Sequence, residues 1–204
     1  MKGLKLSRTA VLAVLFFLAA NILVNENVEA KQKEIASSLV RFHVRANSDS
    51  PEDQELKLKV RDAVVEEMEM LLKDSESVEE SLEIIEQNMK HILTVASQTV
   101  RENGYQLEVS GYITEEYFPL RIYGDVALPP GRYTAFRIDL GAAEGKNWWC
   151  VLYPPLCFVD ITHGVLPQEE KAELKEILGE EEYAVVDTYS LEFKYLKFLN
   201  QWVE

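Results

Sequence analysis

Residues 146–160 of this chain read KNWWCVLYPPLCFVD, and no other stretch is as dense in informative residues. It holds two of the three tryptophans, both cysteines and the adjacent Pro154 and Pro155, with almost no charge. Aromatic and β-branched residues favour buried strands, whereas a proline pair is excluded from the middle of a sheet. The stretch therefore predicts two short strands, over residues 148–153 and 156–161, on either side of a reversal.

The two cysteines stand at mirrored positions about that reversal. If it is tight, Cys150 and Cys157 face each other across the two strands, at a separation that a disulfide can close. The alternative is two buried free thiols that act as small apolar residues, because the consecutive prolines can spoil the hairpin. A redox pair has less support, since the spacing is not C-x-x-C. The compartment of the protein bears on this choice.

The first thirty residues indicate that compartment. Residues 1–8 contain three cations and no acid, and residues 10–24 are apolar apart from Asn21. This run is shorter than the about 20 residues that a membrane span needs. Together with the Val28-Glu29-Ala30 sequence, it is typical of a secretion signal, with an uncleaved anchor as the alternative. We therefore expect residues 1–30 to direct export and residues 31–204 to form one extracytoplasmic domain, where cysteines can oxidise.

The chain is strongly acidic, with a formal net charge of −14. Nucleic acid phosphates and anionic lipid headgroups repel such a chain. We expect no nucleic-acid partner, and membrane contact only through the N-terminal segment. A protein with a basic or apolar face is the expected partner.

The alternation of residues 39–46 predicts an N-terminal strand. Apolar residues occupy one side, and the other side is a cationic stripe formed by Arg41, His43 and Arg45. Period-two alternation of this kind predicts a half-buried strand with the stripe on its outer face.

Two amphipathic helices follow this strand. Ser50 suits the cap of the first, with Pro51 in its first turn, and apolar residues repeat at helical spacing to residue 73. The second begins near Ser77 and ends at Asn103-Gly104. Their short link predicts an antiparallel hairpin, and the heptad-like stripe of the second is too short to favour a coiled-coil dimer over a core seam. The oxygen-rich loop of residues 47–53 lacks calcium-loop spacing, and helix capping explains the same residues.

The rest of the chain changes character after Gly104. Residues 105–114, 120–123 and 132–140 predict further short strands, and residues 167–178 and 188–203 predict helices. The order predicts a single α+β domain with a mainly antiparallel sheet and C-terminal helices. The last helix is apolar on more than one side, so its aromatic residues, which include Phe198 and Trp202, either dock on the sheet or enter a groove of a partner.

No pattern of catalytic residues stands out in the sequence. The three histidines are scattered, and there is no H-E-x-x-H, no G-x-S-x-G and no Gly-rich phosphate loop. A Cys157–His163 pair is conceivable, but spacing alone does not establish the hydrogen bond that it needs. We therefore expect no metal, no cofactor and no enzymatic activity.

Three blocks of the sequence resemble the stage II sporulation protein R family. They read RFHVRANSDSPEDQELKLKVRDAV (residues 41–64), YGDVALPPGRYTAFRI (residues 123–138) and GKNWWCVLYPPLCFVD (residues 145–160). The resemblance covers most of residues 36–162 and implies an exported signal of endospore formation. Such a protein is made in the forespore and enters the space between the two membranes, where it activates the membrane-embedded aspartic protease that processes pro-sigma-E. The family is described as an activator, with no catalytic residues to carry over.

Two functions from different classes follow. The first is a protein ligand of that protease, with Arg41, His43, Arg45, Trp148 and Trp149 as candidate contacts, because Trp and Arg dominate binding hot spots. Since neighbouring strand residues face opposite ways, we expect one tryptophan in the core and the other toward the partner. The second function is a cryptic hydrolase or thiol enzyme that acts on envelope material.

Overall fold

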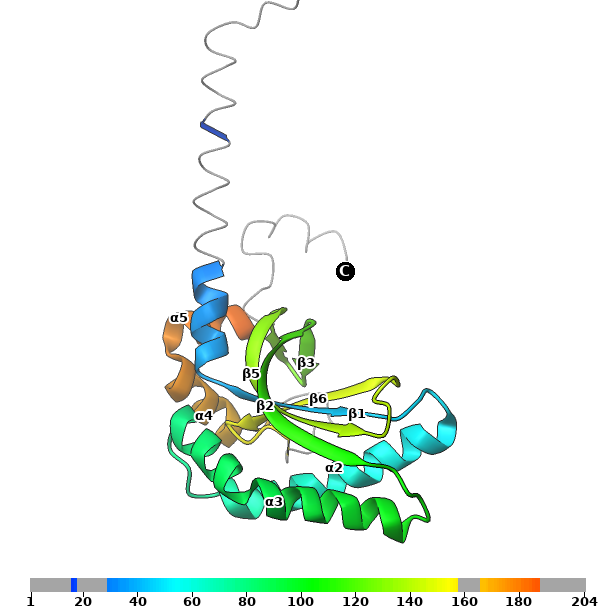
Figure 1. Cartoon of the computed structure of the whole chain (residues 1–204). Helices are drawn as coiled ribbons and strands as arrows, with labels where there is room; N and C mark the ends of the chain where they lie inside the picture. The colour runs from blue at the N-terminus through cyan, green and yellow to red at the C-terminus, as the bar shows by residue number, and fades with distance from the viewer. Residues whose placement is uncertain (1–15, 18–28, 158–165, 188–204) are drawn as a thin grey trace, which may run out of the picture.

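The computed structural model describes residues 16–17, 29–157 and 166–187 (Figure 1). Its centre is a four-stranded sheet in the order β2-β5-β1-β6. The strands are β1 (Val40–Arg45), β2 (Val109–Phe118), β5 (Gly131–Leu140) and β6 (Asn147–Tyr153). β1 and β5 are parallel, whereas the β2–β5 and β1–β6 pairs are antiparallel. The predicted single α+β domain with a mainly antiparallel sheet is confirmed.

Two helices cover one face of the sheet (Figure 1): α2 (Pro51–Leu72) and α3 (Val78–Glu102). The hydroxyls of Ser50 and Ser77 accept hydrogen bonds from the backbone N–H groups of Asp53 and Glu80, which confirms both predicted caps. After α3 the chain turns at Gly104, whose φ of 84° suits glycine. The apolar side of β1 and the stripes of both helices form one buried core, so the predicted core seam is confirmed.

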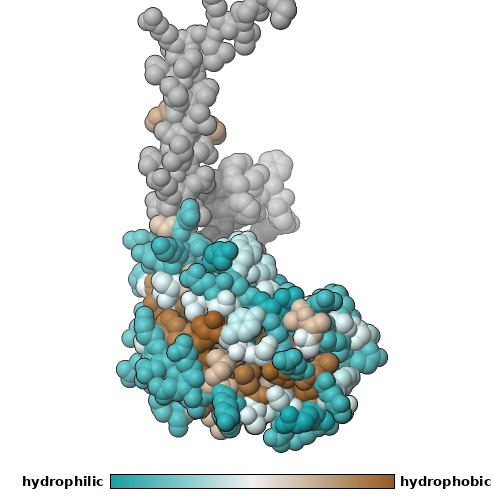
Figure 2. Space-filling view, viewed as in Figure 1, coloured by the Kyte–Doolittle hydropathy of each residue, from teal (hydrophilic) through white to brown (hydrophobic). Residues whose placement is uncertain are grey.

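α3 approaches the edge strand β2 closely. A Cβ at Gly111 would lie 2.6 Å from Cδ2 of Leu93, so this position of the strand requires glycine or a shift of Leu93. Figure 2 shows hydrophobic residues that reach the surface along the line between α3 and β2.

The opposite face of the sheet is covered at one end. The cover consists of a helix over residues 29–37, the β3–β4 ribbon (Arg121–Tyr123 and Val126–Leu128), α4 (Gln168–Leu178) and α5 (Glu180–Val186). Together they bury a second core, which includes Leu39, Phe118, Leu128, Val151 and Leu174. β1 is therefore a central strand with packed residues on both faces.

The prediction of an exposed cationic stripe on β1 is wrong. The exposed fraction is 0% for Arg41 and 2% for His43, and only Arg45 is half-buried. Alternation predicted the two faces of the strand but not their burial, because polar side chains can be buried when partners on other strands satisfy them.

Other boundaries differ from the prediction. β2 begins at Val109 rather than residue 105, and β4 and α5 were not predicted. Leu156 and Cys157 lie in a turn rather than a strand, while the rest of that predicted strand and the predicted helix 188–203 lie outside the described residues. In the described part of the chain, no helix is both long and apolar enough to cross a membrane.

Candidate partner-binding face

The three sequence blocks meet in the sheet. β1 lies in the first block, most of β5 in the second and β6 in the third, and β1 pairs with both of the others. Alternate side chains of these strands and of β2 point to the sheet face that lies opposite α2 and α3, where Arg121 of β3 lies over Trp149. We call its polar part the arginine face, formed by Arg41, His43, Arg45, Tyr112, Glu116, Arg121, Arg137, Asp139, Asn147 and Trp149.

Arg41 lies buried at the base of the arginine face. Its Nε donates to the backbone oxygen of Cys150 at 2.9 Å and its Nη2 to the hydroxyl of Tyr123 at 3.0 Å. The guanidinium carbon lies 4.3 Å from the ring centroid of Phe118 and 4.9 Å from that of Tyr133. Burial lowers the pKa of Arg41, while the neighbouring tyrosines act in the opposite direction. The aromatic rings stabilise this buried cation through cation–π contacts.

His43 connects three strands. Its Nδ1 lies 2.7 Å from Oε1 of Glu116 on β2, and its Nε2 lies 2.8 Å from Oδ1 of Asn147 on β6. Its ring stacks on Trp149 with a centroid separation of 3.9 Å. A ring that donates from both nitrogens suits this arrangement, and a neutral ring suits it if the Asn147 amide is turned over.

Arg137 extends the network along β5. It donates to Asp139 from Nε and Nη2, at 2.8 and 2.9 Å, and its Nη1 lies 3.3 Å from Glu116. Burial alone would lower the pKa of Arg137, but the bonds to Asp139 outweigh it and raise the pKa. The hydroxyl of Tyr112 also donates to Asp139, and burial together with this bond raises the pKa of Tyr112. Both carboxylates of the arginine face, those of Glu116 and Asp139, therefore already have partners within the face.

Arg45 and Arg121 are half-buried at the surface of the arginine face. Arg45 lies in register with Asp139 and Asn147 on the flanking strands. The guanidinium carbon of Arg121 lies 5.7 Å from the ring centroid of Trp149. Within the described residues, neither arginine forms an ion pair, and Nε of each is buried without a hydrogen-bond acceptor.

The two tryptophans lie on opposite faces of β6, as predicted. Trp148 packs edge-on against Phe42 in the first core, with Arg61 over its ring. Trp149 contacts His43 and Phe118 on the arginine face. Both are half-buried, so neither is fully enclosed in a core.

The turn between β2 and β3 adds apolar surface. Leu120 in the turn, Tyr117 at the end of β2 and Ile122 in β3 have side chains that are 52, 61 and 61% exposed. Exposed apolar groups of this size in one short segment are typical of interaction sites. Arg121 belongs to the same segment.

Cys150 and Cys157 are joined in a disulfide, as the favoured interpretation of their spacing requires. The chain turns between them, and the N–H of Cys157 donates to the backbone oxygen of Val151 at 3.1 Å. In this form neither sulfur can act as a thiol nucleophile.

The histidine network does not favour catalysis. A Glu-oriented histidine resembles the base of a nucleophilic enzyme, but Nε2 of His43 faces the Asn147 amide instead of a hydroxyl or thiol. In the described residues, no three His, Cys, Asp or Glu side chains are grouped to hold a metal ion. The geometry suits recognition by charge and aromatic contact.

The oxygen-rich loop before α2 is used for capping. Asp53 accepts hydrogen bonds from the side chains of Ser48 and Asn47, and its own N–H donates to Ser50. The Ser48 bond, followed by that from Asn47, lowers the pKa of Asp53. These oxygens are thus committed within the loop, which confirms the capping interpretation.

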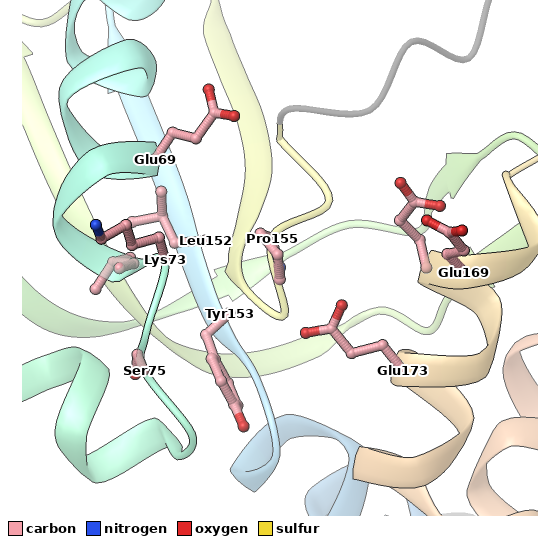
Figure 3. A pocket seen from close by; sticks show the side chains of 10 residues that line it. Glu69, Lys73, Ser75, Leu152, Tyr153, Pro155, Glu169 and Glu173 are labelled. Atoms are coloured by element: carbon pink, nitrogen blue, oxygen red, sulfur yellow. The ribbon is translucent and has the colours of Figure 1, made fainter.

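A separate acidic pocket of about 430 Å³ lies between the end of α2, the turn after β6 and α4 (Figure 3). Glu69, Glu169, Glu170 and Glu173 line it, with Lys73 at its side and Tyr153 and Pro155 at its base. Burial, and then the nearby Glu170 and Glu176, raises the pKa of Glu173. The pocket disfavours anionic ligands.

The sequence candidates divide into four groups. Arg45 and Trp149 lie at the surface of the arginine face, Arg41 and His43 lie beneath it, and Trp148 lies on the other face. Phe198 and Trp202 lie outside the described residues. Sequence reasoning missed Glu116, Arg121, Arg137 and Asn147, although the alternation of β2 and β5 places Glu116 and Arg137 on one side of each strand.

Comparisons with known proteins agree with the resemblance. The family model described as stage II sporulation protein R matches residues 36–163. The stage II sporulation protein R of Bacillus subtilis (strain 168) is 38% identical over 139 residues, which are 67% of this chain and 62% of that protein. The chain thus matches less than two thirds of that relative's length. No solved structure matches the chain.

Proposed function

This chain belongs to the stage II sporulation protein R family, and we propose that it is an exported signal of endospore formation. In this proposal it enters the space between forespore and mother cell. There it activates, by protein–protein contact, the membrane aspartic protease that processes pro-sigma-E. The family match carries the proposal, since it supports a role in sporulation.

Export is supported by the N-terminal pattern and by the disulfide. Residues 1–30 have the basic start and short apolar run of a secretion signal or anchor. Disulfides persist outside the reducing cytoplasm, so the Cys150–Cys157 bond suits a protein that acts beyond the membrane.

Activation requires that this protein bind the active state of the protease more tightly than the inactive state. Each tenfold difference in affinity between the states shifts their ratio tenfold, or about 1.4 kcal/mol. The arginine face and the apolar β2–β3 turn offer the Arg, Trp and Tyr side chains that typically dominate such contacts.

Reconstitution tests the proposed function. The full chain, the protease and its sigma precursor are produced together in non-sporulating cells, and precursor cleavage is measured. The matched control is the same chain without residues 1–30, which stays in the cytoplasm. We expect cleavage only with the exported chain, and equal cleavage without it or with the cytoplasmic form would overturn the proposal.

A further inference from the structure

The buried polar atoms of the described residues point to a feature that the proposed function does not explain. Five buried side-chain nitrogen or oxygen atoms there have no hydrogen-bond partner, and three belong to arginines of the arginine face. They are Nη1 of Arg41, Nε of Arg45 and Nε of Arg121. Buried donors are normally paired, so three unpaired guanidinium nitrogen atoms on one face require an explanation.

The acceptor that best suits a guanidinium is an anion with two oxygens. A guanidinium presents planar, paired donors that match a carboxylate, and charge-assisted bonds of this kind are the strong ones. Arg41 is too deeply buried to touch a ligand directly, but its charge adds to the potential at the surface. Arg45 and Arg121 are half-buried and can contact a ligand from the solvent side.

The carboxylates of the face itself cannot fill this role. Glu116 is held by His43 and Arg137, and Asp139 is held by Arg137 and Tyr112. Four arginines therefore share two engaged carboxylates, in a chain whose net charge is −14. The arginine face is therefore a positively charged region on a protein whose net charge is negative.

The charge of the whole chain decides which anion fits. A membrane of anionic lipids meets the acidic remainder of the surface as well as the arginine face, and is repelled. A peptide segment with one or two carboxylates meets only the arginine face. The half-buried ring of Trp149 and the exposed Tyr112 ring give such a segment aromatic surface to lie on.

We propose that the arginine face binds a carboxylate-bearing segment of a partner protein, with Arg45 and Arg121 as the contacting cations. The inference rests on the proposed function in taking the partner to be a protein. It is tested on the purified chain alone, so its failure is distinguishable from failure of the reconstitution.

The test is an NMR titration of the arginine side-chain Nε–H signals of the full chain. The probe is an acetylated peptide of alternating Asp and Val, and the matched probe has Asn in place of Asp. We expect the Asp peptide to shift the signals of Arg45 and Arg121 and the Asn peptide to leave them in place. R45Q and R121Q should each weaken binding about tenfold or more, because each removes a charge-assisted hydrogen bond. Arg101 is an exposed arginine of α3 that forms no ion pair with any described residue, and R101Q should bind the Asp peptide like the unchanged chain.

Three results would overturn the proposal. The first is no shift of Arg45 and Arg121 with the Asp peptide. The second is stronger binding to phosphatidylglycerol vesicles, lost in R45Q, which would assign the face to a lipid surface. The third is a change of both signals in the free chain when Asp160, Glu192 and Glu204 are replaced by amides, which would make the occupant this chain's own carboxylates.

Discussion

His43 stacks on Trp149 with ring planes 17° from parallel, although the two residues lie far apart in the sequence, on β1 and β6. The same imidazole lies against Glu116 and Asn147, so one side chain links β2, β1 and β6. This contact places the aromatic surface of the arginine face beside its cations.

Replacing His43 with alanine should destabilise the fold. The substitution removes the stacking on Trp149 and the contacts of the imidazole with Oε1 of the half-buried Glu116 and with Asn147. We expect a loss of about 2–4 kcal/mol in the free energy of unfolding, measured by urea denaturation. His91 on α3 is exposed and, among the described residues, pairs with Glu67, so H91A should change stability by less than about 0.5 kcal/mol. Equal effects of the two substitutions would contradict the structure.

Lysine should be a poor substitute for Arg41. The guanidinium donates to Cys150 and Tyr123 while it lies against the rings of Phe118 and Tyr133. A lysine ammonium is a compact, strongly hydrated charge that cannot reproduce these contacts, whereas methionine fills the space without a charge. Thermal unfolding should therefore show R41K to be less stable than R41M. A lysine variant as stable as the unchanged chain would show that the packing of Phe118 and Tyr133 does not depend on the guanidinium.

The disulfide should contribute modestly to stability. The loop between Cys150 and Cys157 is short, so its closure is expected to stabilise the fold by about 2 kcal/mol. The C150S/C157S variant and the chemically reduced chain should lose the same amount in urea denaturation. Alkylation followed by mass spectrometry should label neither cysteine of the exported chain before reduction. Labelling without reduction would restore the free-thiol alternative.

Asp53 should make stability depend on pH on the acidic side. Its pKa is lowered below the ordinary value of 3.8 by the bonds from Ser48 and Asn47. A carboxyl with a lowered pKa stabilises the fold above its ordinary pKa, and this contribution disappears as pH falls through its pKa in the fold. D53N should thus cost about 1 kcal/mol at neutral pH, and the difference should vanish in acid. E52Q, in the same helical turn but exposed, should show no such convergence.

The sequence predicted the local elements better than their burial. Capping residues Ser50 and Ser77 set the start of both long helices, because a cap depends on a few neighbouring residues. The two faces of β1 were also predicted from alternation. Arg41 and His43 can be buried because they pair with Tyr123, Glu116 and Asn147, which are distant in the sequence. No local pattern reveals such pairings.

The candidate site was predicted only in part, because its contacts also join residues that are distant in the sequence. Arg45 and Trp149 were selected because of their residue types, and both lie at the surface of the arginine face. Arg121 was missed because β3 has only three residues, too few for alternation to distinguish its inner from its outer side. Its place over Trp149 arises from the fold of the β3–β4 ribbon.

Photocrosslinking most directly tests the claim that the arginine face contacts the protease. A photoreactive benzoylphenylalanine is placed at Tyr112, which is 40% exposed on this face, or at Met70, which is 59% exposed on α2 on the other side of the sheet. Each full-length variant is exported beside the protease in the reconstituted cells and then irradiated. We expect a crosslink to the protease from position 112 and none from position 70. A crosslink from position 70 alone would place the contact on the helical face and contradict it.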